Sequence, residues 1–147
     1  MSRVVQVTSR AGRLPLSRRR IAALAERVLD AEGVRSAMLS IAFVPDAAIA
    51  RLNARHLGAR GATDVIAFGF VPAADGTPVT GDVYIAPAVA RANARRNGVS
   101  MREELARLVV HGTLHILGHD HPSVGREASP MWRRQEQLLS RWRGAWT

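Results

Sequence analysis

The chain has 147 residues, of which 47% are apolar and 22% are charged, a composition typical of a folded globular protein. Its length predicts a single domain covering residues 1–147, large enough to bury a core without covalent cross-links. The chain contains no cysteine, which excludes disulfides, thiolate metal sites and thiol catalysis. The absence of cysteine also fits a reducing compartment.

The formal net charge is +9, and every basic side chain is an arginine. Guanidinium groups match the geometry of phosphates, and a positive field attracts polyanions. The charge alone fits nucleic-acid binding and an arginine-rich solvated surface equally well. The N-terminus lacks the apolar core of a secretory signal, and the longest apolar run, at 37–44, is far shorter than the ~20 residues of a membrane span. We therefore expect a cytoplasmic protein with no membrane partner.

The first half of the chain predicts two strands and two helices in alternation. A short apolar run predicts a strand at 4–8, and the alternating segment 36–44 predicts a second one. Between them, Ser17 is expected to cap a helix that ends at Gly33. After the second strand, Asp46 is expected to cap a short helix.

The next part of the chain predicts two more strands. Turn-rich residues at 56–63 lead into a strand at 64–70, and a loop at 72–78 leads into a strand at 80–86. Pro87 suits the first turn of the helix that follows, which is expected to end at an Asn-Gly pair.

The C-terminal part predicts two helices. Ser100 and Glu103 match the S-x-x-E pattern of a capping box, which predicts the start of a long helix. A last helix is expected near 127–142. Because strands and helices mix without strict βαβ alternation, we predict an α+β fold.

The segment "HGTLHILGHDH", residues 111–121, holds four of the five histidines of the chain. His111 and His115 are four residues apart, so on a helix they share one face. Gly118 can take the positive φ that lets the chain leave the helix and carry His121 back. The spacing H-x3-H-x5-H predicts three imidazole ligands and an open fourth position, as in catalytic zinc sites. The alternative is a histidine-rich helix end that binds no metal.

The zinc-protease signature H-E-x-x-H-x-x-G-x-x-H has its histidines and glycine at matching positions. Its glutamate, the general base of the proteases, is replaced here by Gly112. Zinc by itself can lower the pKa of a bound water to ~7. The sequence therefore predicts a metal-dependent hydrolase that is not a peptidase.

Two further residues of this segment have several interpretations. His119 is a fourth donor, a substrate contact or a solvated loop residue, and we expect one of the last two because a fourth protein ligand would close the open position. Asp120 is a partner that orients an imidazole, a catalytic base, or a turn residue.

Residues 111–121 resemble the metal motif of the YbeY family, bacterial zinc-dependent endoribonucleases that act in ribosomal RNA maturation. Other segments resemble the family in the same order along the chain: 52–70, 81–87, 100–112 and 131–139. The resemblance implies a zincin-like arrangement, with a small mixed four-stranded sheet packed with helices and one long metal-bearing helix.

The resemblance also implies the chemistry. It implies one zinc ion per chain, held by His111, His115 and His121, and hydrolysis of single-stranded RNA during 3′-end maturation of 16S ribosomal RNA and ribosome quality control. The implied partners are ribosomal RNA, the small ribosomal subunit, and ribosomal or assembly-factor proteins. Three imidazoles accept several divalent ions, so the spacing leaves the metal in the cell open.

The chain departs from the family where an arginine near the metal is replaced by Leu57. Leucine cannot neutralise a phosphate, so we expect Arg60, or else Arg55, to supply the charge from the neighbouring loop. The alternative for Arg60 is a solvated loop residue. Arg91 and Arg95 lie one turn apart on a predicted helix and are expected to contact the RNA backbone.

Two other sets of residues have structural alternatives. Thr63 and Asp64 keep the family pattern, and they either line a cleft beside the metal or fix the turn into the strand. Trp132, Trp142 and Trp146 are expected to be core or helix-packing residues rather than surfaces on which bases stack.

Three functions follow from these residues. The first is a metal-dependent endoribonuclease with Arg60 and Asp120 as catalytic candidates. The second is a ribosome-assembly RNA-binding factor with a largely structural zinc site, which Leu57 favours. The third is a zinc metallopeptidase, against which Gly112 counts.

Overall fold

The structure, a computed structural model, describes residues 2–70, 72, 77–122 and 124–147. Its elements in chain order are β1 (Arg3–Ser9), α1 (Arg18–Ala31), β2 (Ala37–Phe43), α2 (Asp46–Leu57), β3 (Val65–Phe70), β4 (Val79–Ile85), α3 (Pro87–Asn97), α4 (Met101–Ile116), the 3-10 turn η1 (Arg126–Ala128), α5 (Pro130–Arg141) and the 3-10 turn η2 (Arg143–Ala145). The predicted α+β class is confirmed. Within the described residues, no helix is long and apolar enough to cross a membrane.

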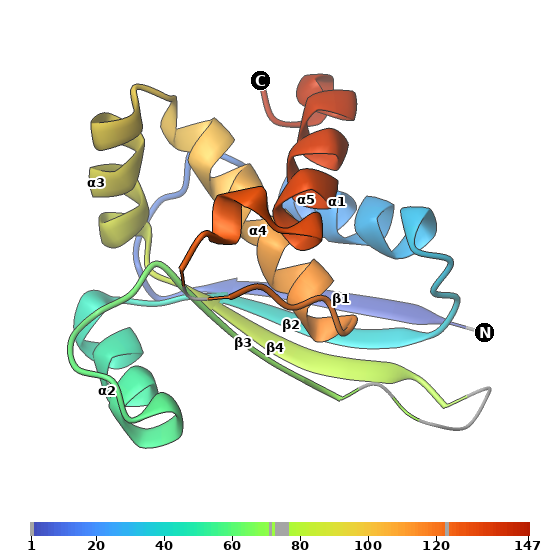
Figure 1. Cartoon of the computed structure of the whole chain (residues 1–147), viewed down its shortest axis with the longest axis horizontal. Helices are drawn as coiled ribbons and strands as arrows, with labels where there is room; N and C mark the ends of the chain where they lie inside the picture. Colours follow the sequence, from blue (N-terminus) through green and yellow to red (C-terminus); the bar gives the residue numbers. More distant parts are fainter. Residues whose placement is uncertain (1, 71, 73–76, 123) are drawn as a thin grey trace.

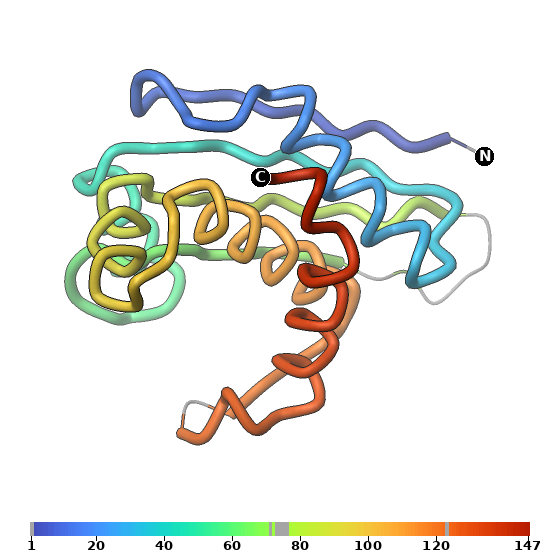
Figure 2. Tube along the Cα trace, turned by 90° about the horizontal axis from the view of Figure 1, so that it is seen from above, coloured from blue at the N-terminus to red at the C-terminus, as the bar shows by residue number. Residues whose placement is uncertain are grey.

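The four strands form one mixed sheet in the order β1-β2-β4-β3. β1, β2 and β4 are parallel, and β3 is an antiparallel edge strand paired with β4. Figure 1 shows α1, α3, α4 and α5 on one side of the sheet and α2 on the other, at one end. Seen from above in Figure 2, α1 and α4 lie over the strands.

The alternation of side chains along the strands separates two apolar clusters. Ile41 and Phe43 of β2 pair in register with Val83 and Ile85 of β4, and all four are fully buried in the larger core beneath α1 and α4. The intervening Tyr84 points to the other face, where it packs against the smaller cluster that anchors α2. The sheet is therefore covered on one face and partly covered on the other.

Most of the predicted helix starts are confirmed. Ser17 and Ser100 each accept a hydrogen bond from a backbone N–H three residues ahead, at 3.2 and 3.0 Å. The prediction for α2 is wrong in detail, because Pro45 is the cap and Asp46 is the first helical residue. At this position the negative charge of Asp46 still stabilises the helix through its interaction with the helix dipole. Of the loop predicted at 72–78, residues 73–76 lie outside the described part of the chain.

Helix α4 packs closely on the sheet because a glycine stands at three points of their contact, one in the helix and two in the strands. A Cβ on Gly112 would stand 2.7 Å from Cγ1 of Val83 in β4. Ile116, one turn further along, lies over Gly69 of β3 and Gly81 of β4, where an added Cβ would come within 2.8 and 2.7 Å of it. Real side chains do not approach so closely, so these glycines set the height of α4 above the sheet.

We predict that Gly112→Ala destabilises the protein. Overpacking a buried contact costs about 1–3 kcal/mol, which outweighs the gain of ~1 kcal/mol in helix propensity. In a Val83→Ala background the added methyl group has room, so the same substitution should become neutral or stabilising. Urea unfolding of the four proteins measures this, and an equal effect of Gly112→Ala in both backgrounds would contradict the close contact.

Candidate active site

The C-terminal end of α4 and the segment that follows it bring two of the predicted ligands, His111 and His121, close together. His111 and His115 lie one turn apart on α4 and are both half-buried. The helix ends at Ile116, and Gly118 has a φ of +100°, which turns the chain back. As a result, the ring centroids of His111 and His121 lie 5.1 Å apart. The predicted return of the chain to the helix is therefore confirmed.

The arrangement is not a finished metal site. Within the described part of the chain, no three His, Asp or Glu side chains already converge closely enough to hold a metal ion. The preformed part is the pair of imidazoles from His111 and His121. His115, the third predicted ligand, lies one turn after His111 on the same helix.

In the described part of the chain, the hydrogen bonds of both paired imidazoles engage Nδ1 and leave Nε2 free. Nδ1 of His111 lies 2.7 Å from Oε1 of Gln135, and the amide of Gln135 is oriented because its Nε2 donates to Oε2 of Glu136 at 2.9 Å. Since a carbonyl oxygen accepts, Nδ1 of His111 donates and Nε2 keeps its lone pair. His121 repeats the pattern, with Nδ1 3.1 Å from the carbonyl oxygen of Pro122. Metal-binding histidines are oriented in this way, so the donor set fits a metal ion such as zinc.

The environment of His111 also favours the neutral form that a ligand needs. Burial lowers the pKa of His111, and the hydrogen bond to Gln135 opposes this shift without reversing it. The neighbouring His121 lowers the pKa further. The imidazole is therefore neutral at pH 7 and available to a cation.

A polar cavity of about 490 Å³ opens beside His111, between α3, α4 and the start of α5. Its lining includes the charged residues Asp64, Arg96, Glu104, Arg107, Arg126, Glu127 and Glu136. Asp64 joins this cavity to the sheet, because its carboxylate accepts hydrogen bonds from Thr63 at 3.4 Å and Asn93 at 3.2 Å. The sequence left two roles open for Asp64, lining a cleft or fixing the turn into the strand. In the structure Asp64 does both.

An ion-pair network supports the wall of this cavity. Arg107 pairs with Glu103 at 2.9 Å, with Glu104 at 3.2 Å and with Glu136 at 2.9 Å. Burial raises the pKa of Glu104, although the charge of Arg107 opposes the shift. Because Glu136 also holds the amide of Gln135, the network reaches His111 through two hydrogen bonds.

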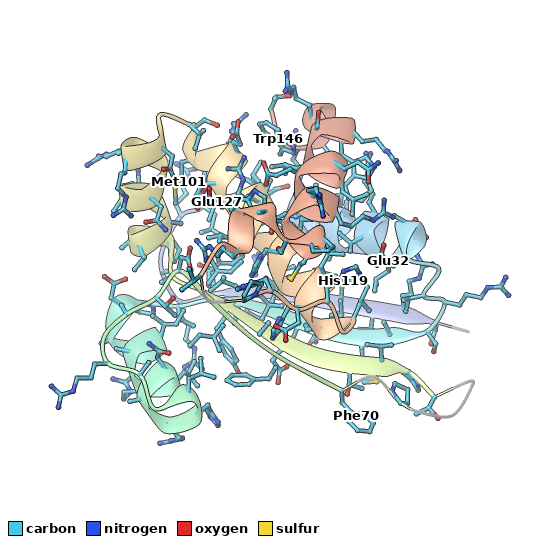
Figure 3. All side chains as sticks on the ribbon, viewed as in Figure 1. Glu32, Phe70, Met101, His119, Glu127 and Trp146 are labelled. Carbon is cyan, nitrogen blue, oxygen red and sulfur yellow. The ribbon has the colours of Figure 1, made fainter. Side chains whose placement is uncertain are left out.

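His119 and Asp120 have roles in the structure of the loop. Nε2 of His119 lies 2.5 Å from Oε1 of Glu32, and Arg134 of α5 binds the other oxygen of Glu32 at 3.0 Å. Figure 3 shows His119 and Glu32 side by side. His119 is therefore not a freely solvated loop residue, and its exclusion as a metal ligand stays a prediction. Asp120 accepts a hydrogen bond from the backbone N–H of His121 at 2.8 Å, which is the behaviour of a turn residue.

The sequence model of the family described as "Endoribonuclease YbeY" matches residues 6–143. The chain belongs to the YbeY family.

Curated relatives named "Endoribonuclease YbeY" match this chain over most of their length. The protein of Frankia casuarinae is 40% identical, and the match covers 96% of this chain and 75% of the relative. The protein of Thermobifida fusca is 38% identical, with 95% and 94% covered. In fold, the chain is similar to the solution structure of a Thermotoga maritima protein, with a TM-score of 0.61, 22% identity, and 96% and 93% covered.

Leu57, which stands where the YbeY pattern has an arginine, has an exposed side chain. Leu57 is the last residue of α2 and 59% of its surface is accessible. Arg55 and Arg60 are exposed beside it and do not belong to the lining of the cavity next to His111. The expected replacement for the family arginine is therefore near in sequence but is not assembled with the histidines.

The other expected RNA contacts lie on α3. Arg91 and Arg95 are both exposed on this helix, one turn apart as predicted. The next residue, Arg96, lines the cavity. The basic residues of α3 thus continue from the surface to the rim of the site.

Sequence reasoning missed Gln135, which orients His111. A signal was present, because the C-terminal YbeY pattern M-x-x-x-E-x-x-I-L places a glutamate at this position of the segment 131–139. It also missed Arg126 and Trp132 in the cavity wall, for which the sequence offered no spacing signal.

The structure also explains why a protease-type glutamate cannot stand at position 112. Gly112 is buried and faces Val83, with no room for a Cβ. A glutamate there would collide with β4 instead of reaching a water beside the histidines. This observation counts against the peptidase interpretation.

We predict that Gln135→Leu weakens zinc affinity by about 10–100-fold, because Nδ1 of His111 loses the acceptor that fixes its tautomer. Gln135 is fully buried and leucine has a similar volume, so the fold should persist. Gln135→Glu keeps an acceptor and serves as the matched control. Competition with a chromophoric chelator measures affinity, and nitrogen NMR of the imidazole measures the tautomer. Unchanged values in the leucine variant would contradict this role.

Proposed function

We propose that this protein is a zinc-dependent single-strand endoribonuclease that acts in ribosomal RNA processing, including 3′-end maturation of 16S ribosomal RNA and ribosome quality control. The observation that carries the proposal is the pair of His111 and His121, each with Nε2 free, inside the metal motif of a family of endoribonucleases. The names of the relatives support the nuclease chemistry, and the donor set supports the metal.

In this proposal His111, His115 and His121 hold one zinc ion per chain through their Nε2 atoms. When bound, the ion supplies Lewis-acid chemistry to a phosphodiester and its attacking water. Gln135 and the carbonyl of Pro122 keep two of the imidazoles in the ligating tautomer. The neutral state of His111, favoured by burial, avoids competition between a proton and the metal.

In this proposal, arginines neutralise the negative charges of the RNA substrate. Arg60 is the proposed catalytic arginine, because its loop runs directly into Asp64 at the wall of the cavity. Arg55, Arg91 and Arg95 are exposed and are proposed to bind the RNA backbone without reading sequence. For Asp120, its contact with the backbone of His121 supports a role in positioning that ligand.

The proposed partners are ribosomal RNA and the small ribosomal subunit, with ribosomal or assembly-factor proteins beside them, in the cytoplasm. A formal net charge of +9 favours association with such a polyanion. A second candidate function is an assembly factor that binds ribosomal RNA and whose zinc site is largely structural. Leu57 favours it, because a site without the family arginine has lost one means of neutralising a phosphate.

The test of the proposal is cleavage of a 3′-extended fragment of small-subunit ribosomal RNA by zinc-loaded protein, beside His115→Ala purified identically. We expect cleavage by the wild type and a loss of at least about 100-fold in the variant. Equal cleavage by both proteins would contradict the proposal, because it would indicate a contaminating nuclease. No cleavage by a wild type that contains zinc and binds the RNA would favour the assembly factor.

The same assay with Leu57→Arg separates an impaired site from a compensated one. A gain of tenfold or more would show that position 57 limits the wild-type reaction. An unchanged rate would show that another arginine carries the charge, and Arg60→Ala in the same assay should then lose activity.

We predict that His111→Ala, His115→Ala and His121→Ala each lose most of the bound zinc, and that His119→Ala keeps it. His119 is the matched control, because it lies in the same segment but binds Glu32. Metal analysis of the purified, folded variants measures this. Equal zinc loss in His119→Ala would contradict the assignment of three ligands.

A further inference from the structure

We propose that the cavity beside His111 is a nucleobase-binding subsite in which Trp132 supplies the stacking surface. The inference rests on the proposed RNA substrate and names the part of it that this cavity holds. Four features of the described residues support it: the placement of Trp132, its contact with Arg126, the balance of charge, and the position of His111 in the cavity wall.

Trp132 differs from the other two tryptophans. Trp146 is 5% exposed and its indole N–H donates to the backbone of Leu139 at 3.1 Å, and Trp142 packs against the main core. Trp132 is half-buried on the first turn of α5 and lines the cavity. The prediction of core or helix packing is confirmed for Trp146 and Trp142, whereas Trp132 is the one of the three that borders the cavity.

The indole of Trp132 is positioned for stacking. Its backbone N–H donates to Oγ of the capping Ser129 at 3.2 Å, which fixes the residue at the start of α5. The guanidinium carbon of Arg126 lies 5.5 Å from the centre of the ring. This is a cation–π contact on one face of the indole, and a base would stack on the other face.

The charges of the cavity suit a base better than a phosphate. Its three arginines stand beside the four carboxylates Asp64, Glu104, Glu127 and Glu136, so the lining has no excess of positive charge. Arg107 is also neutralised by its ion pairs with glutamates. A nucleobase edge carries both donors and acceptors and can use such a mixed lining, whereas a phosphate would meet repulsion.

The cavity has the size and the position that a subsite needs. A volume of about 490 Å³ lies within the usual range for small-ligand sites, so it admits one nucleoside. Figure 3 labels Glu127 of η1 at one part of the wall, and His111 lies in the same lining. A base stacked on Trp132 would therefore bring the adjoining phosphate toward the imidazole pair, where the proposed reaction takes place.

The test measures equilibrium binding of nucleoside monophosphates to the zinc-loaded protein by calorimetry. Ribose 5-phosphate, which lacks a base, is the ligand control. Trp132→Ala should weaken nucleotide binding by about tenfold, as expected for one lost stacking contact. Trp132→Phe should keep most of the affinity, and Trp142→Phe should behave as the wild type. Ribose 5-phosphate should bind the wild type and Trp132→Ala equally.

Two results would overturn the subsite: equal nucleotide affinity in Trp132→Ala and the wild type, or an equal loss for ribose 5-phosphate. Because no bond is cleaved in this assay, its result is separate from that of the nuclease test. If the protein cleaves RNA and Trp132→Ala does not change base binding, the proposed function stands and the subsite is refuted. If Trp132→Ala weakens base binding but the protein cleaves no RNA, the subsite stands and the proposed function is refuted.

Discussion

The contact of α4 with the sheet is the constraint on which the candidate site depends. A Cβ at Gly112 would collide with Val83 of β4, and a Cβ at Gly69 or Gly81 would collide with Ile116. His111 directly precedes the first contact and His115 directly precedes the second. The helix can therefore neither rotate nor rise without breaking a contact next to a candidate ligand, which holds the two histidines on a defined face.

From this anchored helix, hydrogen bonds extend outward to α5. His111 is joined to Gln135, Gln135 to Glu136, and Glu136 to Arg107 on α4 again. The pairing of Arg107 with its glutamates offsets part of the cost of burying charge beside the cavity. Gln135 is neutral, so it orients the imidazole without adding a charge of its own. Because Trp132 stands one turn earlier on the same helix, α5 contributes to both the imidazole pair and the proposed base subsite.

The local features of the fold were predictable from the sequence. Caps such as Ser17 and Ser100, the alternation along β2 and the helix spacing of His111 and His115 depend on neighbours a few residues away. The positive φ of Gly118 belongs to the same class. These features placed the elements and the motif correctly.

The features that were not predicted join residues far apart in the chain. Gln135 lies 24 residues from His111, and Glu32 lies 87 residues from His119, so no local spacing indicates either contact. The cavity wall likewise combines residues of α3, α4 and α5. Such partners follow from packing, which a single sequence does not determine.

The central claim is that three imidazoles and no other protein group hold the metal. X-ray absorption spectroscopy of the zinc-loaded protein measures this directly. The account predicts one zinc ion per chain, bound by three imidazole nitrogens with a non-protein oxygen in the fourth position. A spectrum with four imidazole nitrogens, or a protein that binds no stoichiometric zinc, would contradict it.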